Sequence, residues 1–176
     1  MPGAIYVAYL NRYAPAWEDL LGEAIGESFP RRIVRPLHAG IDLAPSYAPD
    51  RRQYHATLIL ASLLRRLPEP DAKIVGVTSV DLFIPVLTFV FGQSQLNGPS
   101  ALVSTYRLHN EFYGLPPDDG LLVERTTKEA VHELGHAFGL VHCSDHRCVM
   151  HASTYVEEVD LKSAEFCAAC GPAIGA

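Results

Sequence analysis

The sequence contains no long uninterrupted hydrophobic run and no excess of positive charge. Its longest apolar segment, VDLFIPVLTFVFG, is interrupted by Asp81 and Pro85 and falls short of the roughly 20 residues of a membrane span. The formal net charge of the 176-residue chain is −6, and its arginines and lysines form no extended basic stretch. We therefore expect neither a membrane segment nor a nucleic-acid partner.

Cysteine is scarce, and its four copies are confined to the last third of the chain, at Cys143, Cys148, Cys167 and Cys170. The first residues, MPGAIYVAYLNRY, lack a charged region followed by a long apolar core, so we expect no signal peptide. A cytoplasmic, monomeric protein is the resulting prediction. In a reducing compartment a cysteine cluster binds a metal more often than it forms disulfides.

The composition and the order of the apolar segments predict a single domain over residues 1–176 with a sheet at its centre. We expect strands at residues 4–10, 31–37 and 73–79, and helices at residues 14–29 and 48–70. This alternation predicts a largely parallel sheet. Two further strands, residues 87–95 and 100–108, are joined by a short turn at Asn97 and Gly98, so they should pair antiparallel.

The next helix carries the residues with the clearest chemistry. After a loop at residues 109–120, we expect this helix over residues 126–139, with a last helical segment over residues 157–169. Thr126 and Glu129 have the spacing of a capping box at its start. A glycine at position 139 is a natural stop at its end.

The stretch HELGHAFGLVH indicates a zinc site. His132 and His136 lie one turn apart on the same helix face. A turn at Gly139 allows His142 to become a third ligand. Three imidazoles leave a tetrahedral zinc with one open position, where the metal lowers the pKa of a water toward about 7. Glu133 is then placed to take the water's proton and pass it to a leaving amine, as in a zinc peptidase.

Two other interpretations of the histidines stay open at this point. The pair on the helix could lie on the surface, with an unrelated third histidine downstream. A three-histidine zinc could also be purely structural, although Glu133 would then have no evident task.

The longer pattern resembles a known family. HELGHAFGLVH followed by Met150 resembles the zinc motif and Met-turn of the metzincin metallopeptidases, and the four cysteines narrow the resemblance to the archaemetzincins, in which they bind a second zinc. VGVTSVDLFIPVLTFVFG and SALVSTYRL also resemble that family. Some metzincins have a tyrosine ligand two residues after the methionine; that position is Ala152 here, so three histidines and a water are the expected ligands.

The resemblance implies a metzincin-like α/β (α+β) fold. We expect a mixed, mostly parallel sheet of about five strands with a backing helix and an active-site helix, forming an upper subdomain over residues 1–139. Residues 140–176 would form a smaller, zinc-stapled lower part, with Met150 supporting the catalytic site from below. The strand at residues 87–95 would border the cleft, where a peptide substrate could pair with it.

The four cysteines suit a closed, tetrahedral structural zinc that ties the loop after His142 to the C-terminal helix. The alternatives are two disulfides or a redox-active CxxC, the latter disfavoured if the motif ends a helix. Because His142 and Cys143 are neighbours, loss of the cysteine site should disturb the histidine site.

These observations predict a zinc-dependent metallopeptidase with two zinc ions, one catalytic and one structural. Its expected partner is a peptide or protein substrate. The alternatives are a zinc-stabilised binding protein with little turnover, or a hydrolase of non-peptide amides that uses the same groups. No residue in the sequence marks a specificity pocket.

Overall fold

The computed structural model describes residues 3–175 and has a five-stranded sheet at its centre. In spatial order the strands are β2 (Val34–Ala39), β1 (Ile5–Leu10), β5 (Lys73–Thr78), β8 (Ser100–Ser104) and β7 (Gly92–Ser94). The first four pair in parallel, and β7 pairs antiparallel with β8. The expected mixed, mostly parallel sheet is therefore confirmed, with β7 as an edge strand.

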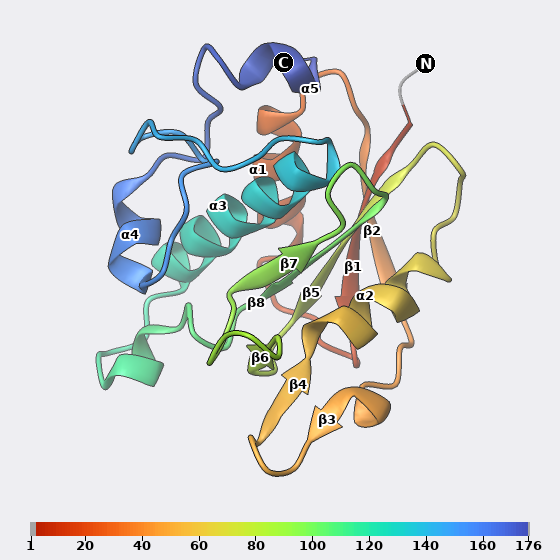
Figure 1. Ribbon diagram of the computed structural model, residues 1–176, viewed down its shortest axis with the longest axis vertical. Coiled ribbons are helices and arrows are strands. Elements are labelled where there is room, and N and C mark those ends of the chain that lie inside the picture. Colours follow the sequence, from red (N-terminus) through yellow and green to blue (C-terminus); the bar gives the residue numbers. More distant parts are fainter. Residues whose placement is uncertain (1–2, 176) are drawn as a thin grey trace.

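Helices cover both faces of this sheet (Figure 1). Helices α1 (Glu18–Ser28) and α3 (Asp119–Ala137) pack on one face, and α2 (Ala56–Leu64) packs on the other. All six residues of β1 are buried, and alternate side chains join the two hydrophobic clusters on opposite faces. A continuous apolar run in a strand is what burial on both faces requires.

A second, small sheet lies where the sequence suggested the start of a long helix. It consists of β3 (Tyr47–Ala48), β4 (Gln53–His55) and β6 (Leu82–Phe83). The expected helix over residues 48–70 is therefore wrong in its first part and holds only over α2. Arg52 has a left-handed backbone, with φ 56°, and makes the turn between β3 and β4. Two short 3-10 helices are η1 (Ala44–Ser46) and η2 (Asn110–Tyr113).

The antiparallel hairpin is confirmed, but its strands are shorter than predicted. Val90 makes an isolated bridge to Leu82 of the small sheet rather than continuing β7. Residues 84–91 consequently leave the central sheet and form a separate wall beside α3. The chain also turns away after Ser104, because the backbone N–H of Leu108 donates to the carbonyl of Thr105.

Helix α3 begins at Asp119, well before the predicted start at Thr126. Asp118 is the N-cap, and its side chain accepts a 2.9 Å hydrogen bond from the backbone N–H of Leu121. Thr126 lies inside the helix, where its hydroxyl donates to the Leu122 carbonyl at 2.7 Å. The predicted capping box is therefore wrong, because an earlier residue satisfies the free N–H groups of the first turn.

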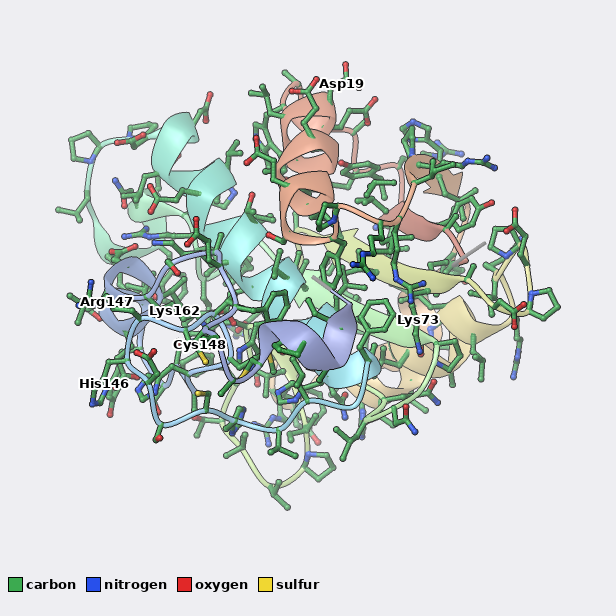
Figure 2. The ribbon with its side chains drawn as sticks, turned by 90° about the horizontal axis from the view of Figure 1, so that it is seen from above. Asp19, Lys73, His146, Arg147, Cys148 and Lys162 are labelled. Carbon is green, nitrogen blue, oxygen red and sulfur yellow. The ribbon has the colours of Figure 1, made fainter. Side chains whose placement is uncertain are left out.

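The C-terminal segment contains two short helices, α4 (Val156–Leu161) and α5 (Gly171–Ile174). The predicted helix over residues 157–169 is thus wrong beyond α4, because Lys162 adopts an extended backbone and ends the helix there. Figure 1 shows the segment, in blue, beside α3 and away from β3 and β4. In Figure 2, His146 lies at its outer edge and Cys148 lies further in.

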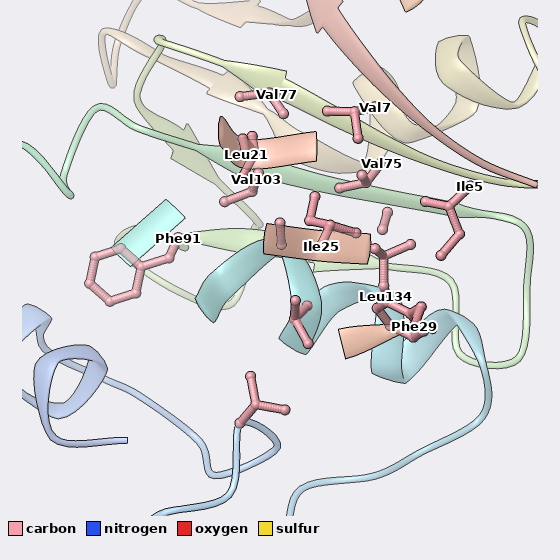
Figure 3. Close-up of a cluster of buried hydrophobic side chains, with 14 of the residues drawn as sticks. Ile5, Val7, Leu21, Ile25, Phe29, Val75, Val77, Phe91, Val103 and Leu134 are labelled. Carbon is pink, nitrogen blue, oxygen red and sulfur yellow. The ribbon is translucent and has the colours of Figure 1, made fainter. Parts of the chain in front are cut away.

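The hydrophobic core continues from the sheet into this C-terminal segment. Figure 3 shows Val75 and Val103 of the sheet facing Ile25 of α1 and Leu134 of α3. Met150 belongs to the same buried cluster, together with other residues that follow α3. The segment after α3 therefore packs on the core of the preceding residues rather than on a core of its own.

Among the described residues, none of the helices has both the length and the apolar character needed to cross a membrane.

Candidate active site and metal centres

Three histidines converge beside the last turn of α3. His132 and His136 project from the helix with their Nε2 atoms 3.1 Å apart. His142 reaches the same point from the following loop, after a turn at Gly139, whose φ is +96°. One nitrogen from each ring lies within 4.8 Å of the others, so a single metal ion can be held by all three.

Backbone carbonyls fix the orientation of the two helical imidazoles. His132 Nδ1 lies 2.8 Å from the carbonyl oxygen of Val149, and His136 Nδ1 lies 2.8 Å from that of Leu140. A carbonyl only accepts hydrogen bonds, so each Nδ1 carries the proton and each Nε2 presents a lone pair. Burial, aided by the positive charge of Lys162, holds the pKa of His132 well below its ordinary value. The ring is therefore neutral, as a metal ligand must be.

Glu133 is buried next to His132 and held by the edge strand. Ser94 of β7 donates a 2.8 Å hydrogen bond to Glu133 Oε2. Gly92 is required beside it, because a Cβ there would come within 2.7 Å of Glu133 Cγ. Burial raises the pKa of Glu133 to about 8, the charge of Glu129 adds to this rise, and the Ser94 hydrogen bond opposes it. A carboxyl group with this pKa can accept and release a proton near neutral pH.

Glu129 and Lys162 form a buried ion pair one turn before the histidines, and the sequence did not reveal it. Lys162 Nζ lies 2.8 Å from Glu129 Oε1, and the two side chains are 0% and 5% exposed. The contact is ionic rather than a well-aligned hydrogen bond. Lys162 also donates to the carbonyl of His151 at 3.2 Å. The spacing of Glu129 from Glu133 places both on one helix face, but no sequence pattern identifies Lys162 as the partner.

The end of α3 is fastened to the sheet. Lys73 of β5 donates from Nζ to the carbonyls of Ala137 and Gly98, at 2.8 and 2.9 Å. The backbone N–H of Asn97, in the β7–β8 turn, donates to the carbonyl of His136 at 2.9 Å. These bonds satisfy carbonyls that a helix end leaves without partners, and a cation there complements the helix dipole. The position of His136 is thereby set by residues of the sheet and of the β7–β8 turn, outside its own helix.

Met150 is fully buried against α3. It packs against Gly135, where a Cβ would fall inside the contact distance of the Met150 sulfur. The backbone N–H of Cys143 donates to the Met150 carbonyl at 2.9 Å, which closes the loop that follows His142. The residue expected to support the site from below is therefore packed between the active-site helix and this loop.

The four cysteines form a second cluster. Their sulfurs all lie within 4.8 Å of one another, and all four are free thiols. The backbone N–H groups of Cys170 and Ala169 lower the pKa of Cys167 to about 7, whereas burial raises the pKa of Cys148 and of Cys170. A four-sulfur set at this spacing fits one tetrahedral metal ion. The CxxC motif precedes the short helix α5 and does not end a helix. The argument that disfavoured a redox role because the motif ends a helix is therefore wrong.

A cleft of about 610 Å³ opens over Glu133 and the three histidines. Glu129 and residues 152–154 also line this cleft. The wall at residues 84–91 is mainly apolar, and Phe89 and Phe91 contact each other edge to face. A cleft with apolar walls and a few polar groups at its base suits a peptide with hydrophobic side chains.

This wall is held by polar residues that the sequence did not single out. Arg51 Nη2 donates to the carbonyls of Leu87 and Thr88, at 2.9 and 3.1 Å. Gln53 donates to Thr88 and to Asp81 at 3.0 Å. The turn between β3 and β4 therefore holds the wall at residues 84–91, and through it the small sheet helps to shape the cleft.

Comparison with known proteins places the chain in a family. Residues 65–175 match the family model described as Peptidase family M54. The chain is 46% identical over 152 residues to a curated protein named Archaemetzincin from Methanocaldococcus jannaschii, covering 85% of this chain and 80% of that protein. It is 42% identical over 166 residues to the Archaemetzincin of Thermococcus kodakarensis, covering 90% and 88%.

Solved structures agree with these sequence relatives. A zinc-dependent peptidase from Methanocorpusculum labreanum superposes with a TM-score of 0.88 at 32% identity, covering 97% of this chain and all of that one. The Archaemetzincin of Methanopyrus kandleri superposes with a TM-score of 0.84 at 35% identity, covering 99% and 94%. The fold, the family match and the paired histidine and cysteine clusters agree: the chain belongs to peptidase family M54, the archaemetzincins, and is a zinc-dependent metallopeptidase.

Proposed function

We propose that His132, His136 and His142 hold the catalytic zinc and that Glu133 is the general base and acid of peptide hydrolysis. The observation that carries this assignment is the convergence of three imidazole nitrogens within 4.8 Å beside a buried carboxyl group. When bound, zinc supplies Lewis-acid chemistry for the scissile carbonyl and makes water more acidic.

Glu133 has two oxygens with different surroundings. The hydroxyl of Ser94 donates to Oε2, so we assign proton transfer to Oε1. Oε1 would accept the proton of the attacking water and deliver it to the nitrogen of the leaving amine. The pKa of about 8 favours the half of the cycle in which the carboxyl group holds the proton, and the positive charge of a bound zinc would lower this pKa and favour the half in which it accepts the proton.

We propose that the substrate is a protein or peptide chain that lies along β7. This strand ends the sheet order, with β8 as its partner on one side. Its residues Gly92–Ser94 border the cleft next to Glu133. An extended peptide could therefore pair with the edge strand and place its scissile bond over the site. A peptide-inhibitor complex without main-chain pairing to β7 would contradict this arrangement.

The second metal site is the cysteine cluster, which we propose holds a structural zinc, for two zinc ions per chain. Four thiolate ligands leave no open coordination position, so this site stabilises structure rather than performing chemistry. It joins the loop after His142 to the turn before α5. Met150, packed against Gly135 of α3, would keep that loop in place.

Metal analysis by mass spectrometry tests this count directly. Two zinc ions per purified chain are expected. One zinc together with oxidised cysteines would refute the structural site.

We also propose a monomeric, cytoplasmic, single-domain protein that binds neither nucleic acid nor membranes. The net charge of −6 and the four free thiols support this proposal. Light scattering after size exclusion should give the mass of one chain. A dimeric mass would contradict the proposed monomeric state.

A peptide-library digest tests the reaction. The wild-type protein should cleave a subset of the peptides, and Glu133→Ala should cleave none at a measurable rate. Cleavage that persists in the variant would refute the role of Glu133. Absence of cleavage by both proteins would favour the alternative of a zinc-stabilised binding protein.

A further inference from the structure

His146 and His151 form a third histidine group, outside both clusters described above. His146 Nδ1 lies 3.2 Å from His151 Nε2, and the ring centroids are 4.6 Å apart. In the catalytic pair, the Nε2 atoms of His132 and His136 are 3.1 Å apart and the centroids are also 4.6 Å apart. The two pairs therefore have nearly the same nitrogen-to-nitrogen geometry.

His151 is also oriented as a ligand. Its Nδ1 lies 3.0 Å from the carbonyl oxygen of Cys143, to which it donates a hydrogen bond. The proton is thus on Nδ1, and the lone pair of Nε2 points at His146. This is the arrangement that Val149 and Leu140 impose on the catalytic histidines. A carbonyl that accepts the proton of one ring nitrogen fixes the tautomer in which the other nitrogen can bind a metal.

The loop that carries the pair is held by short-range hydrogen bonds. The backbone N–H of Cys148 donates to the Asp145 carbonyl at 3.1 Å, and that of His151 donates to the Cys148 carbonyl at 2.9 Å. The Asp145 side chain accepts from the backbone N–H of Arg147 at 2.9 Å. The backbone of the loop is consequently ordered before any ion arrives, which reduces the cost of binding.

A hydrogen bond between the two rings is the simpler account of their approach. In that case His146 donates from Nδ1 to His151 Nε2. The same contact keeps both nitrogens at a separation that two ligands of one tetrahedral ion need, since Zn–N bonds are about 2.0–2.1 Å long. A hydrogen bond in the free protein and a shared ion in the loaded protein therefore use one geometry; when the ion binds, the proton of His146 moves from Nδ1 to Nε2 and the ring stays neutral.

We propose that His146 and His151 form a third, solvent-open metal site that takes Zn²⁺ or another imidazole-binding divalent ion. The protein supplies two ligands, and solvent completes the coordination. His146 is exposed and His151 is half-buried, so ions exchange there more readily than in the cysteine cluster. The site depends on its own two rings and not on the roles proposed for the other clusters.

Such an ion would act on the loop it binds. His151 contacts the carbonyl of Cys143 through its ring, and its own carbonyl accepts from Lys162. An ion bridging to His146 would therefore clamp the segment between the cysteine cluster and the buried ion pair. Because it binds the folded loop, it should raise the thermal stability of the protein when zinc is in excess.

The test uses untagged protein that has been loaded with zinc and dialysed. Isothermal titration with Zn²⁺ should show one additional ion per chain for the wild type. His146→Gln should weaken this additional binding at least about tenfold. His38→Gln is the matched control, because His38 is also exposed, with a side chain 61% accessible, and lies on β2. It should bind the additional ion as the wild type does.

Cobalt identifies where the ion goes. Co²⁺ added to the zinc-loaded protein should give absorption bands without a thiolate charge-transfer band, and His146→Gln should lose these bands. A thiolate band would instead report metal exchange at the cysteine cluster and contradict binding at the histidine pair. Equal affinities of the wild type and His146→Gln, or no additional ion in the wild type, would overturn the third site while leaving the two proposed zinc sites untouched.

Discussion

The hydroxyl of Ser94 and the carboxyl group of Glu133 are joined by a 2.8 Å hydrogen bond between the edge strand β7 and the active-site helix α3. The bond crosses from the element that borders the cleft to the residue proposed to move protons. It holds one carboxyl oxygen and leaves the other for chemistry.

Loss of this bond should lower activity more than stability. Ser94→Ala removes the donor, so Glu133 gains rotational freedom and we expect kcat/KM to fall about tenfold, or about 1.4 kcal/mol. Zinc content should not change. Ser79→Ala is a control, because Ser79 is exposed outside the cleft. An unchanged kcat/KM in Ser94→Ala would show that the bond has no part in catalysis.

The contact between Gly135 and Met150 leaves no room for a methyl group. Gly135→Ala should destabilise the protein by about 1–3 kcal/mol through overpacking. Thermal unfolding should show a fall of about 2–4 °C for each kcal/mol. Gly22→Ala, in α1, is the matched control, because a Cβ there meets nothing within 4 Å. Alanine should be neutral or stabilising at that position. Equal melting temperatures for the two variants would contradict the tight packing under the site.

The Glu129–Lys162 pair should behave as a unit. Lys162→Met leaves a buried carboxylate without its partner and should cost about 3–5 kcal/mol in urea denaturation. Adding Glu129→Gln removes the uncompensated charge, so the double variant should lose much less than the sum of the single variants. Additive losses would show that the two side chains are not coupled.

The two metal sites should be linked through the loop that begins at His142. Cys170→Ala removes one sulfur, so the cysteine cluster should lose its zinc. The affinity of the histidine site should then fall by about tenfold, because Cys143 no longer holds its neighbour in place. Zinc release in a chelator competition series measures both effects. Full retention of affinity at the histidine site would separate the two sites.

Local sequence patterns predicted most of the central sheet and all seven histidines and cysteines of the two clusters. The histidine pair is set by one helical turn, and the cysteines stand out because the chain has no others. Strands buried on both faces read as apolar runs, which is why β1 and β5 lie close to their predicted bounds. These features depend on neighbours within a few residues.

Features that depend on distant partners were not predicted. Thr126 and Glu129 have the spacing of a capping box, but both lie in the middle of α3. Thirteen of the nineteen residues of this helix are buried, so its polar residues contact other parts of the protein and do not mark the start of the helix. Lys162, Arg51 and Ser94 act on segments far along the chain. No local periodicity encodes such pairs, and β4 likewise depends on its pairing with β6.

The fastening of α3 to the sheet also constrains the order of folding. Lys73 and the carbonyl it binds at Ala137 are 64 residues apart in the chain. Contacts over such separations form slowly, because a long loop must close first. The amides of β5, which pairs with β1 over a similar separation, and the amide of Asn97, which donates to the His136 carbonyl, should therefore gain protection together and late in pulse-labelled hydrogen exchange during refolding. The catalytic metal would then enter a pocket shaped by a completed sheet rather than serve as the nucleus around which the chain folds.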